Sequence, residues 1–251
     1  MFLARIAFEV LGPRSLAVIA DSPSLPRREL EEALALGQTF GFPVEVVRTS
    51  EFSDNRYLEN PLNRCYFCKQ ALFAELVPLA RARGFDVVVY GENASDVGDH
   101  RPGGQAANEF SVRAPLKEVG LTKAEIRKMS SEMGLPTADK PEMACLSSRI
   151  PTGEIVTIAK LRMVEEAENF LRDAGFYDVR VRHHELPASL SGARPVYLAR
   201  IQVGASEFSR FLESGRAEQT ELKLKSIGYH HVTVDLAPYR RGPLGVGIQP
   251  R

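Results

Sequence analysis

Apolar residues in the first half of the chain alternate between short continuous runs and longer stretches with helical spacing. The runs predict buried β-strands and the stretches predict amphipathic helices. The predicted helices cover residues 2–11, 27–40, 70–83 and 122–133. The predicted strands cover residues 16–20, 44–47 and 87–90. Strands that alternate with helices in this way are typical of an α/β fold, a parallel sheet with helices on both faces.

The pattern changes near residue 150. Beyond it, helices are predicted over residues 160–174, 207–214 and 217–227, and strands over residues 178–182, 196–203 and 231–236. We therefore expect two domains, an α/β domain over residues 1–150 and a smaller α+β domain over residues 151–251. The stretch 186–195 is rich in Ser, Ala, Gly and Pro and is predicted to be an exposed loop.

Composition excludes several classes of protein. The 32 basic and 32 acidic residues are interleaved and sum to a net charge of zero, which argues against nucleic acid or an anionic membrane as the partner. No run of about 18 apolar residues is present, so no spanning helix is expected. Three cysteines are an odd number in a chain too long to need disulfides, so we expect free thiols and a cytoplasmic location.

The three cysteines are candidates for chemistry. Cys65 and Cys68 form a CxxC motif, predicted to lie in a loop just before a helix. Two thiolates at this spacing can share a soft metal or a cluster, or form a redox pair; the alternative is two ordinary buried thiols. Cys145 would be a third ligand if the fold brings it near. Lys140 and Arg149 flank Cys145, and nearby cations lower the pKa of a thiol, so Cys145 is also a candidate reactive thiol.

The loops after Ala20, Val47 and Tyr90 follow predicted parallel strands. Ligands of such sheets bind beyond the carboxyl ends of the strands. The third loop begins with the sequence GENASD at residues 91–96, whose acidic and amide groups suit the hydroxyls of a nucleotide or a magnesium ion. The alternative is an ordinary turn rich in Asn, Asp and Gly.

Two arginines alternate with valines in the second half of the chain. A strand would place Arg180 and Arg182 on one face, about 7 Å apart, where they could grip a phosphate. The alternative is a solvated strand face. His183 and His184 are expected at the surface, and Glu168 is expected on the solvated face of its helix.

Several ordered segments together match one known family. They are residues 20–30 (ADSPSLPRREL), 63–69 (NRCYFCK), 91–103, 112–116 (VRAPL), 134–136, 139–151, 180–182 (RVR), 228–229, 232–236 and 239–240. Taken together, they resemble the LarE family of ATP-dependent sulfur transferases, in the PP-loop (adenine nucleotide alpha-hydrolase) superfamily. The resemblance spans nearly the whole chain.

The resemblance implies a PP-loop-type parallel sheet and a specific reaction. ATP, with Mg²⁺, would activate a carboxylate of pyridinium-3,5-dicarboxylate mononucleotide as an acyl-adenylate. A sulfur nucleophile would then replace AMP, giving a thiocarboxylate used in a nickel-pincer cofactor. AMP is a good leaving group and a thiolate is a strong nucleophile, so this order of steps is chemically sound. The resemblance also implies a homo-oligomer.

The resemblance also implies roles for individual residues. Cys145 matches the sulfur-supplying cysteine of the family. Members with a single cysteine sacrifice its sulfur and keep dehydroalanine, whereas members with the CxxC motif are thought to hold a [4Fe–4S] cluster on three cysteines. Cys65, Cys68 and Cys145 match the second pattern. The remaining implied residues are Asp21, Ser22, Gly91, Asn93 and Asp96 for the nucleotide; Arg180, Arg182, Ser148, Arg149 and Arg113 for the substrate; and Glu168 and Asp96 for a metal.

Three departures from the family pattern stand out. The family's Ser-Gly-Gly-x-Asp-Ser pyrophosphate loop and first strand would precede Phe2, so the sheet is expected to lack its first strand. Gln202 stands where the family usually has Glu, and Pro243 stands where it tends to have Ser.

Two alternatives to this function stay open. One is an inactive remnant that binds nucleotide or an iron–sulfur cluster, and the other is an adenylating thiolase that acts on tRNA.

Overall fold

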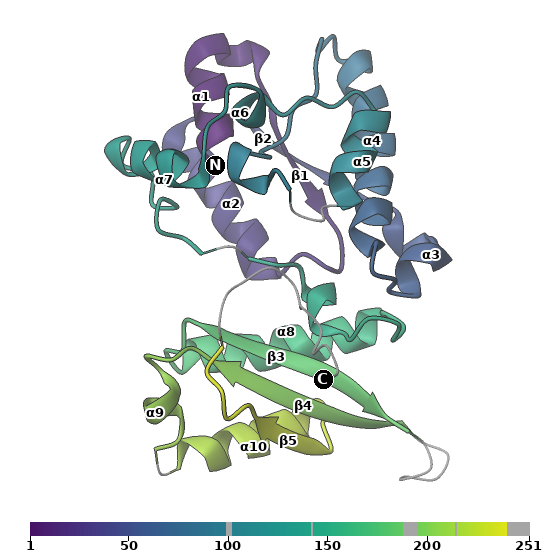
Figure 1. Cartoon of the computed structure of the whole chain (residues 1–251), viewed down its shortest axis with the longest axis vertical. Helices are drawn as coiled ribbons and strands as arrows, with labels where there is room; N and C mark the ends of the chain where they lie inside the picture. The colour runs from purple at the N-terminus through teal and green to yellow at the C-terminus, as the bar shows by residue number, and fades with distance from the viewer. Residues whose placement is uncertain (99–101, 142, 188–194, 214, 240–251) are drawn as a thin grey trace. The chain divides into compact units, whose positions relative to one another are not determined.

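The structure is a computed structural model that describes residues 1–98, 102–141, 143–187, 195–213 and 215–239. The chain divides into two compact units, Met1–Cys145 and Leu146–Arg251, each with its own core (Figure 1). In the part of the chain that is described, no helix is both long and apolar enough to cross a membrane.

A small parallel sheet lies in the first unit. Strand β1 (Ala17–Asp21) pairs in parallel with β2 (Val44–Arg48), and helix α2 (Arg27–Phe40) connects them. A Cβ atom added at Gly37 would lie 2.3 Å from Cγ2 of Val44. Glycine at this position therefore lets α2 pack closely against β2.

The other α-helices of the first unit contribute residues to two hydrophobic clusters, except α3. They are α1 (Phe2–Leu11), α3 (Asn55–Leu58), α4 (Arg64–Ala82), α5 (Pro102–Glu109), α6 (Pro115–Glu118) and α7 (Lys123–Glu132). Phe73 of α4 packs with Ala106 and Ala107 of α5, so these two helices lie side by side (Figure 1). Phe2, Leu116 and Leu135 form the second cluster, which holds α1 against α6.

The helical periodicity placed several boundaries correctly. Helices α1 and α2 begin and end where the sequence predicts. Gly12 ends α1 with φ +57°, a backbone angle that glycine adopts without strain. Thr122 and Glu125 form a reciprocal capping box at the start of α7, which satisfies backbone N–H groups that the helix itself leaves unpaired.

The predicted strand over residues 87–90 is wrong. This segment makes one parallel bridge, from Val89 to Arg113. The Arg113 N–H donates to Val88, and the Tyr90 N–H donates to Arg113. The next donor on the partner segment would be Pro115, which has no N–H, so the ladder ends after one bridge.

The predicted loop around the CxxC motif is also wrong. Helix α4 begins at Arg64, so Cys65 and Cys68 lie within its first two turns. Hydrogen bonds from the Arg64 N–H to Pro61 and from the Tyr66 N–H to Asn63 start the helix there. The first six residues of α4 carry few aliphatic side chains, which is why apolar periodicity alone placed the start near residue 70.

The second unit is a three-stranded mixed sheet with helices packed on one face. Strand β3 (Val179–Leu186) pairs antiparallel with β4 (Val196–Val203), which pairs in parallel with β5 (His231–Val234). The helices are α8 (Ile158–Asp173), α9 (Phe208–Phe211) and α10 (Arg216–Ile227). Leu171 of α8 and Leu224 of α10 belong to the same buried core as Val181 and Ile201 of the sheet. Of the loop predicted over residues 186–195, residues 188–194 lie outside the described residues.

Two predictions of exposure in this unit are wrong. His183 alternates with Arg182 and is fully buried, because its face of β3 is the face that α8 and α10 cover. Glu168 lies on the buried side of α8 with only 1% of its surface exposed. Both residues are polar, so the sequence pattern gave no signal that they point into the core.

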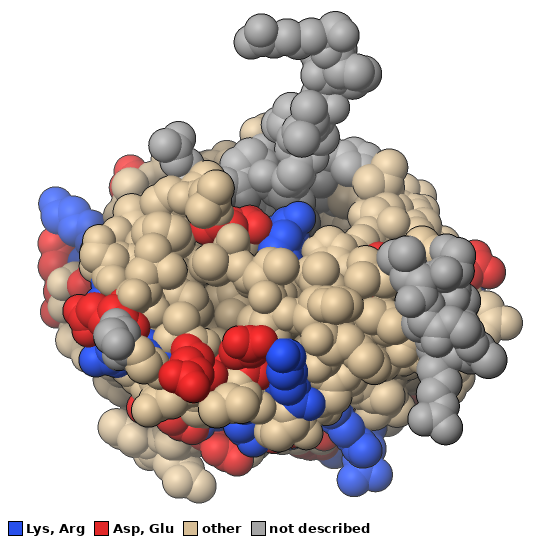
Figure 2. Space-filling view, turned by 90° about the horizontal axis from the view of Figure 1, so that it is seen from below, with Lys and Arg blue, Asp and Glu red and all other residues tan. Residues whose placement is uncertain are grey.

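Charges of both signs are mixed on the molecular surface. Figure 2 shows Lys and Arg side chains beside Asp and Glu side chains, with no broad area of one sign on the described part of this face. Ion pairs such as Lys223–Glu166 and Lys225–Glu221 are examples. The interleaving expected from the sequence is therefore present in three dimensions.

Candidate functional site

Cys145 comes together in the first unit with two thiols that lie far from it in sequence, and we call the three the thiol site: Cys65, Cys68 and Cys145. Positions three apart share one side of a helix, so α4 presents Cys65 and Cys68 together. Arg64, the neighbour of Cys65, brings its Nη2 atom to 3.9 Å from the Sγ atom of Cys145. Burial first, and then the charge of Cys145, raises the pKa of Cys65, so these two sulfur atoms influence each other.

Charged residues that the sequence analysis did not single out surround the thiol site. Burial, and next the carboxylate of Glu51, raises the pKa of Cys68 to about 12. Glu51 is 1% exposed, and its Oε2 atom has no hydrogen-bond partner among the residues that the structure describes. Burial lowers the pKa of Lys69. Neither Glu51 nor Lys69 belongs to an apolar pattern, so only the fold shows that both lie near the thiols.

A cation that the sequence analysis did not single out lies beside Cys145. Arg64 brings a guanidinium nitrogen to 3.9 Å from its sulfur and so supplies positive charge there. Lys140, which flanks Cys145 in sequence, binds Glu29 at 2.7 Å and also Glu32. Burial alone would lower the pKa of Lys140, but its hydrogen bonds to the two glutamates raise it overall. Arg149 forms an ion pair with Glu168; an influence of Lys140 or Arg149 on Cys145 stays a prediction.

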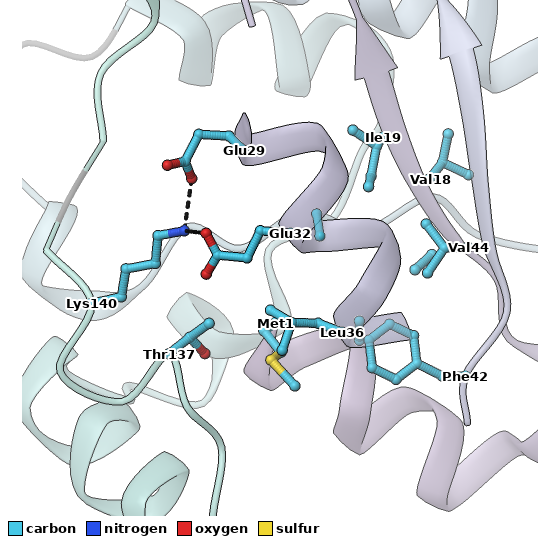
Figure 3. A pocket seen from close by; sticks show the side chains of 13 residues that line it. Met1, Val18, Ile19, Glu29, Glu32, Leu36, Phe42, Val44, Thr137 and Lys140 are labelled. Atoms are coloured by element: carbon cyan, nitrogen blue, oxygen red, sulfur yellow. Dashed lines mark hydrogen bonds and ion pairs between the residues drawn. The ribbon is translucent and has the colours of Figure 1, made fainter. Parts of the chain in front are cut away.

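A cavity of about 280 Å³ lies between β1, β2 and α2. Figure 3 shows Val18, Ile19 and Val44 on its strand side, and Lys140 with its two glutamate partners on the opposite side. The apolar side is suited to a flat ring, and the Lys140 side is suited to polar groups.

A second cavity, of about 430 Å³, shares Met1, Glu29, Thr137 and Lys140 with the first. Gly91 and Asn93, two residues predicted to bind nucleotide, line it. The two neighbouring cavities reach the size of small-molecule sites. They form the candidate nucleotide site of the first unit.

The other predicted nucleotide residues have partners within the chain. Asp21 ends β1 and pairs with Arg27 at 2.6 Å, while the Ser22 hydroxyl accepts the Ser24 N–H. Asp96 accepts hydrogen bonds from the backbone and side chain of Asn93, which is the turn geometry weighed as the alternative for this loop. Roles for these residues in binding nucleotide or magnesium stay predictions.

The exposed face of the sheet in the second unit carries a group of polar side chains that we call the arginine face: Arg180, Arg182, Arg200, Gln202 and Asp235. Arg180 lies opposite Gln202 and Arg182 opposite Arg200 in the β3–β4 register. The Arg180 guanidinium stacks on the Tyr239 ring, with its Cζ atom 4.8 Å from the centroid. Three guanidinium groups against one carboxylate give this face an excess of positive charge.

Burial and neighbouring guanidinium groups lower the pKa values of two residues of the arginine face. Burial first, and then Arg149, lowers the pKa of Arg180. Burial first, and then Arg200, lowers the pKa of Arg182. A bound anion offsets the repulsion between guanidinium groups that lie close together. A phosphate suits such groups because its oxygens can accept hydrogen bonds from the planar N–H donors.

Two predicted substrate residues stand next to the arginine face within the second unit. The backbone oxygen of Ser148 accepts from Nη1 of Arg182 at 3.4 Å. Arg149 is buried and donates two hydrogen bonds to Glu168, at 2.8 and 3.0 Å. Glu168 also accepts from the Val181 N–H, so this pair fixes β3 against α8. Arg113, a further predicted substrate residue, is exposed in the first unit and pairs with Glu118.

The described residues contain no group of three or more His, Cys, Asp or Glu side chains placed to hold a single metal ion. A four-iron cluster differs from one ion because each cysteine binds a different iron atom. Such a cluster ordinarily takes four cysteine thiolates, so the three cysteines of the thiol site match its ligand type but would leave one iron atom without a cysteine. Both side-chain oxygens of Glu168 accept hydrogen bonds from arginine side chains, and its role as a metal ligand stays a prediction.

Comparisons with known proteins agree with the motifs. The pyridinium-3,5-bisthiocarboxylic acid mononucleotide synthase of Lactiplantibacillus plantarum, a LarE protein, is 30% identical over 239 residues, which are 95% of this chain and 82% of that protein. This chain belongs to the LarE family. An uncharacterized Synechocystis protein is 41% identical over 96% of this chain and 86% of its own length. An uncharacterized protein of Methanocaldococcus jannaschii is 25% identical over 90% of this chain and 81% of its own length. No family model matches the chain.

Proposed function

We propose that this chain is an ATP-dependent sulfur transferase that converts a carboxylate of a pyridinium mononucleotide into a thiocarboxylate. The observation that carries the proposal is the convergence of Cys65, Cys68 and Cys145 in one unit of a LarE-family chain. The same unit holds two adjoining cavities of about 280 and 430 Å³. We assign these cavities to ATP.

The first step of the proposed reaction joins the substrate carboxylate to AMP. The carboxylate oxygen attacks the α-phosphorus of ATP, and the bond to pyrophosphate breaks. The product is an acyl-adenylate, whose carbonyl carbon is a far better electrophile than that of the free carboxylate. Mg²⁺ would neutralise charge on the phosphates and so help pyrophosphate to leave.

The second step transfers sulfur. A sulfur nucleophile at the thiol site attacks the acyl carbon, the bond to AMP breaks, and a carbon–sulfur bond forms. Cys65, Cys68 and Cys145 would hold a [4Fe–4S] cluster, which would supply the transferred sulfide when it is bound. If the chain binds no cluster, the Cys145 sulfur itself is the candidate nucleophile; its Cβ–Sγ bond would then break with loss of the Cα proton, which releases the thiocarboxylate and leaves dehydroalanine.

We assign the arginine face to the phosphate of the substrate. Arg180 and Arg182 lie on one face of β3, partly buried, with an excess of positive charge around them. A phosphate that carries two negative charges matches this excess, and binding it would fix the position of the pyridinium ring. Arg149 and Ser148 would then act by holding β3 and Arg182 in place.

The test combines the anaerobically reconstituted chain with pyridinium-3,5-dicarboxylate mononucleotide, ATP and Mg²⁺. We expect pyrophosphate, AMP and a thiocarboxylate product, together with iron and sulfide in equal amounts in the protein. Formation of the thiocarboxylate by protein that contains no iron, together with a mass loss equal to H₂S at Cys145, would show that Cys145 gives up its own sulfur and that no cluster takes part. Absence of both pyrophosphate and thiocarboxylate would overturn the proposal and leave a LarE-family chain that binds without turnover.

A further inference from the structure

We propose that Arg64 is a positioning residue of the thiol site, which holds the Cys145 sulfur in place and sets a positive charge beside it. This inference rests on the proposed function, because it concerns the sulfur that is transferred. It goes further by naming the group that makes Cys145 differ from Cys68.

Arg64 reaches two of the three thiols from a buried position. It is the first residue of α4 and is 9% exposed. Its Nη2 atom lies 3.9 Å from the Cys145 sulfur, and its side chain also hydrogen-bonds Cys65. A guanidinium group keeps its charge at all ordinary pH values. Arg64 therefore places a permanent positive charge beside these two sulfur atoms.

Asn60 anchors the guanidinium. The Oδ1 atom of Asn60 accepts a hydrogen bond from Nη1 of Arg64. Asn60 is 1% exposed and has φ +55°, a left-handed conformation that asparagine tolerates better than most residues. This backbone turn directs the carboxamide toward Arg64. With Nη1 held by Asn60, Nη2 is directed at Cys145.

Other charged residues give the three thiols of the site different electrostatic surroundings. Glu51 is the charged residue with the largest effect on Cys68, and its carboxylate opposes negative charge on that sulfur. The ammonium group of Lys69 lies over the rings of Phe73 and Tyr90, 5.6 and 5.5 Å from their centroids. The Cys145 sulfur consequently lies beside a positive charge, whereas the Cys68 sulfur lies under the influence of a negative one.

Alkylation of the iron-free, full-length chain tests this without ATP or substrate. Iodoacetate is an anion and iodoacetamide is neutral, so the ratio of their rate constants at Cys145, resolved by peptide mass spectrometry, reports positive charge beside the sulfur. We expect Arg64→Met to lower this ratio about tenfold, because a charge contact at about 4 Å is lost. Arg64→Lys should keep most of it. Arg56→Met, which removes an exposed charge from α3, should leave it unchanged.

The Asn60→Gly variant distinguishes misplacement of the Arg64 guanidinium from a failure to fold, since glycine keeps the left-handed backbone and removes the carboxamide. We expect it to lower the ratio as Arg64→Met does, with little change in thermal stability, and Asn60→Asp to preserve it. An unchanged ratio in both Arg64→Met and Asn60→Gly would overturn the inference, whatever their stability. Loss of sulfur transfer in the wild-type chain would not affect this measurement, so the two proposals fail separately.

Discussion

Across β3 and β4, the Nε atom of Arg182 donates a hydrogen bond to Oε1 of Gln202, 2.7 Å away. The amide nitrogen of Gln202 in turn donates to Asp235 at 2.7 Å. A neutral amide thus holds Arg182 without cancelling its charge. Gln202 stands where a glutamate is usual in the LarE family, and glutamate would offset part of the positive charge of the arginine face.

Gln202→Glu should therefore weaken the binding of the substrate phosphate. The new carboxylate would form an ion pair with Arg182 and compete with the incoming anion, so we expect the dissociation constant to rise about tenfold. Calorimetry with the pyridinium mononucleotide measures this constant. Gln219→Glu, the same change on an exposed residue of α10, is the matched control. Equal affinity of the two variants would show that the arginine face is not the phosphate site.

Glu168→Gln should destabilise the second unit strongly. Glu168 and Arg149 are 1% and 2% exposed, and removal of one partner leaves an uncompensated buried charge, which costs about 3–5 kcal/mol. The free energy of unfolding in urea measures the loss. Glu166→Gln, on the same helix, breaks a surface pair in which the glutamate side chain is 56% exposed, and should cost less than about 1 kcal/mol. Similar losses in the two variants would refute the structural role of Glu168.

His183 should make the stability of the second unit depend on pH. Burial lowers the pKa of His183 from 6.5 to about 4, so between these values the unfolded chain binds a proton that the folded chain does not. Stability is then complete above pH 6.5 and falls as the pH drops toward 4, by about 1.4 kcal/mol per pH unit. Urea unfolding across this range measures the slope.

His183→Phe removes the titrating group and should flatten the slope. His231→Gln, a change at an exposed histidine of β5, should leave it as in the wild-type chain. The account of His183 fails if His183→Phe and the wild-type chain lose stability in parallel below pH 6.5.

Local pattern was enough to predict most of the elements. The capping box at Thr122 and the left-handed glycine at Gly12 rest on interactions within a few residues, which a sequence displays directly. The alternation at Arg180 and Arg182 likewise put both guanidinium groups on one strand face. The strand over residues 87–90 failed because Pro115, 25 residues beyond Tyr90, ends its ladder.

Partners that lie far apart in sequence were not predictable in this way. Lys140 and Arg149 stand near Cys145 in the chain, but the guanidinium that lies 3.9 Å from its sulfur is that of Arg64, 81 positions before it. His183 and Glu168 are polar residues in the core, and each depends on a partner that periodicity does not identify. The grouping of the three cysteines was expected only from the family resemblance. The oligomeric state stays a prediction.

One comparison tests the central claim, that sulfur reaches an activated carboxylate through the thiol site. The wild-type chain and Cys145→Ala are each given ATP, Mg²⁺ and pyridinium-3,5-dicarboxylate mononucleotide, and pyrophosphate and thiocarboxylate are measured in the same samples. We predict that Cys145→Ala still releases pyrophosphate but forms no thiocarboxylate, because adenylation does not need the thiol. Undiminished thiocarboxylate from Cys145→Ala would contradict the account.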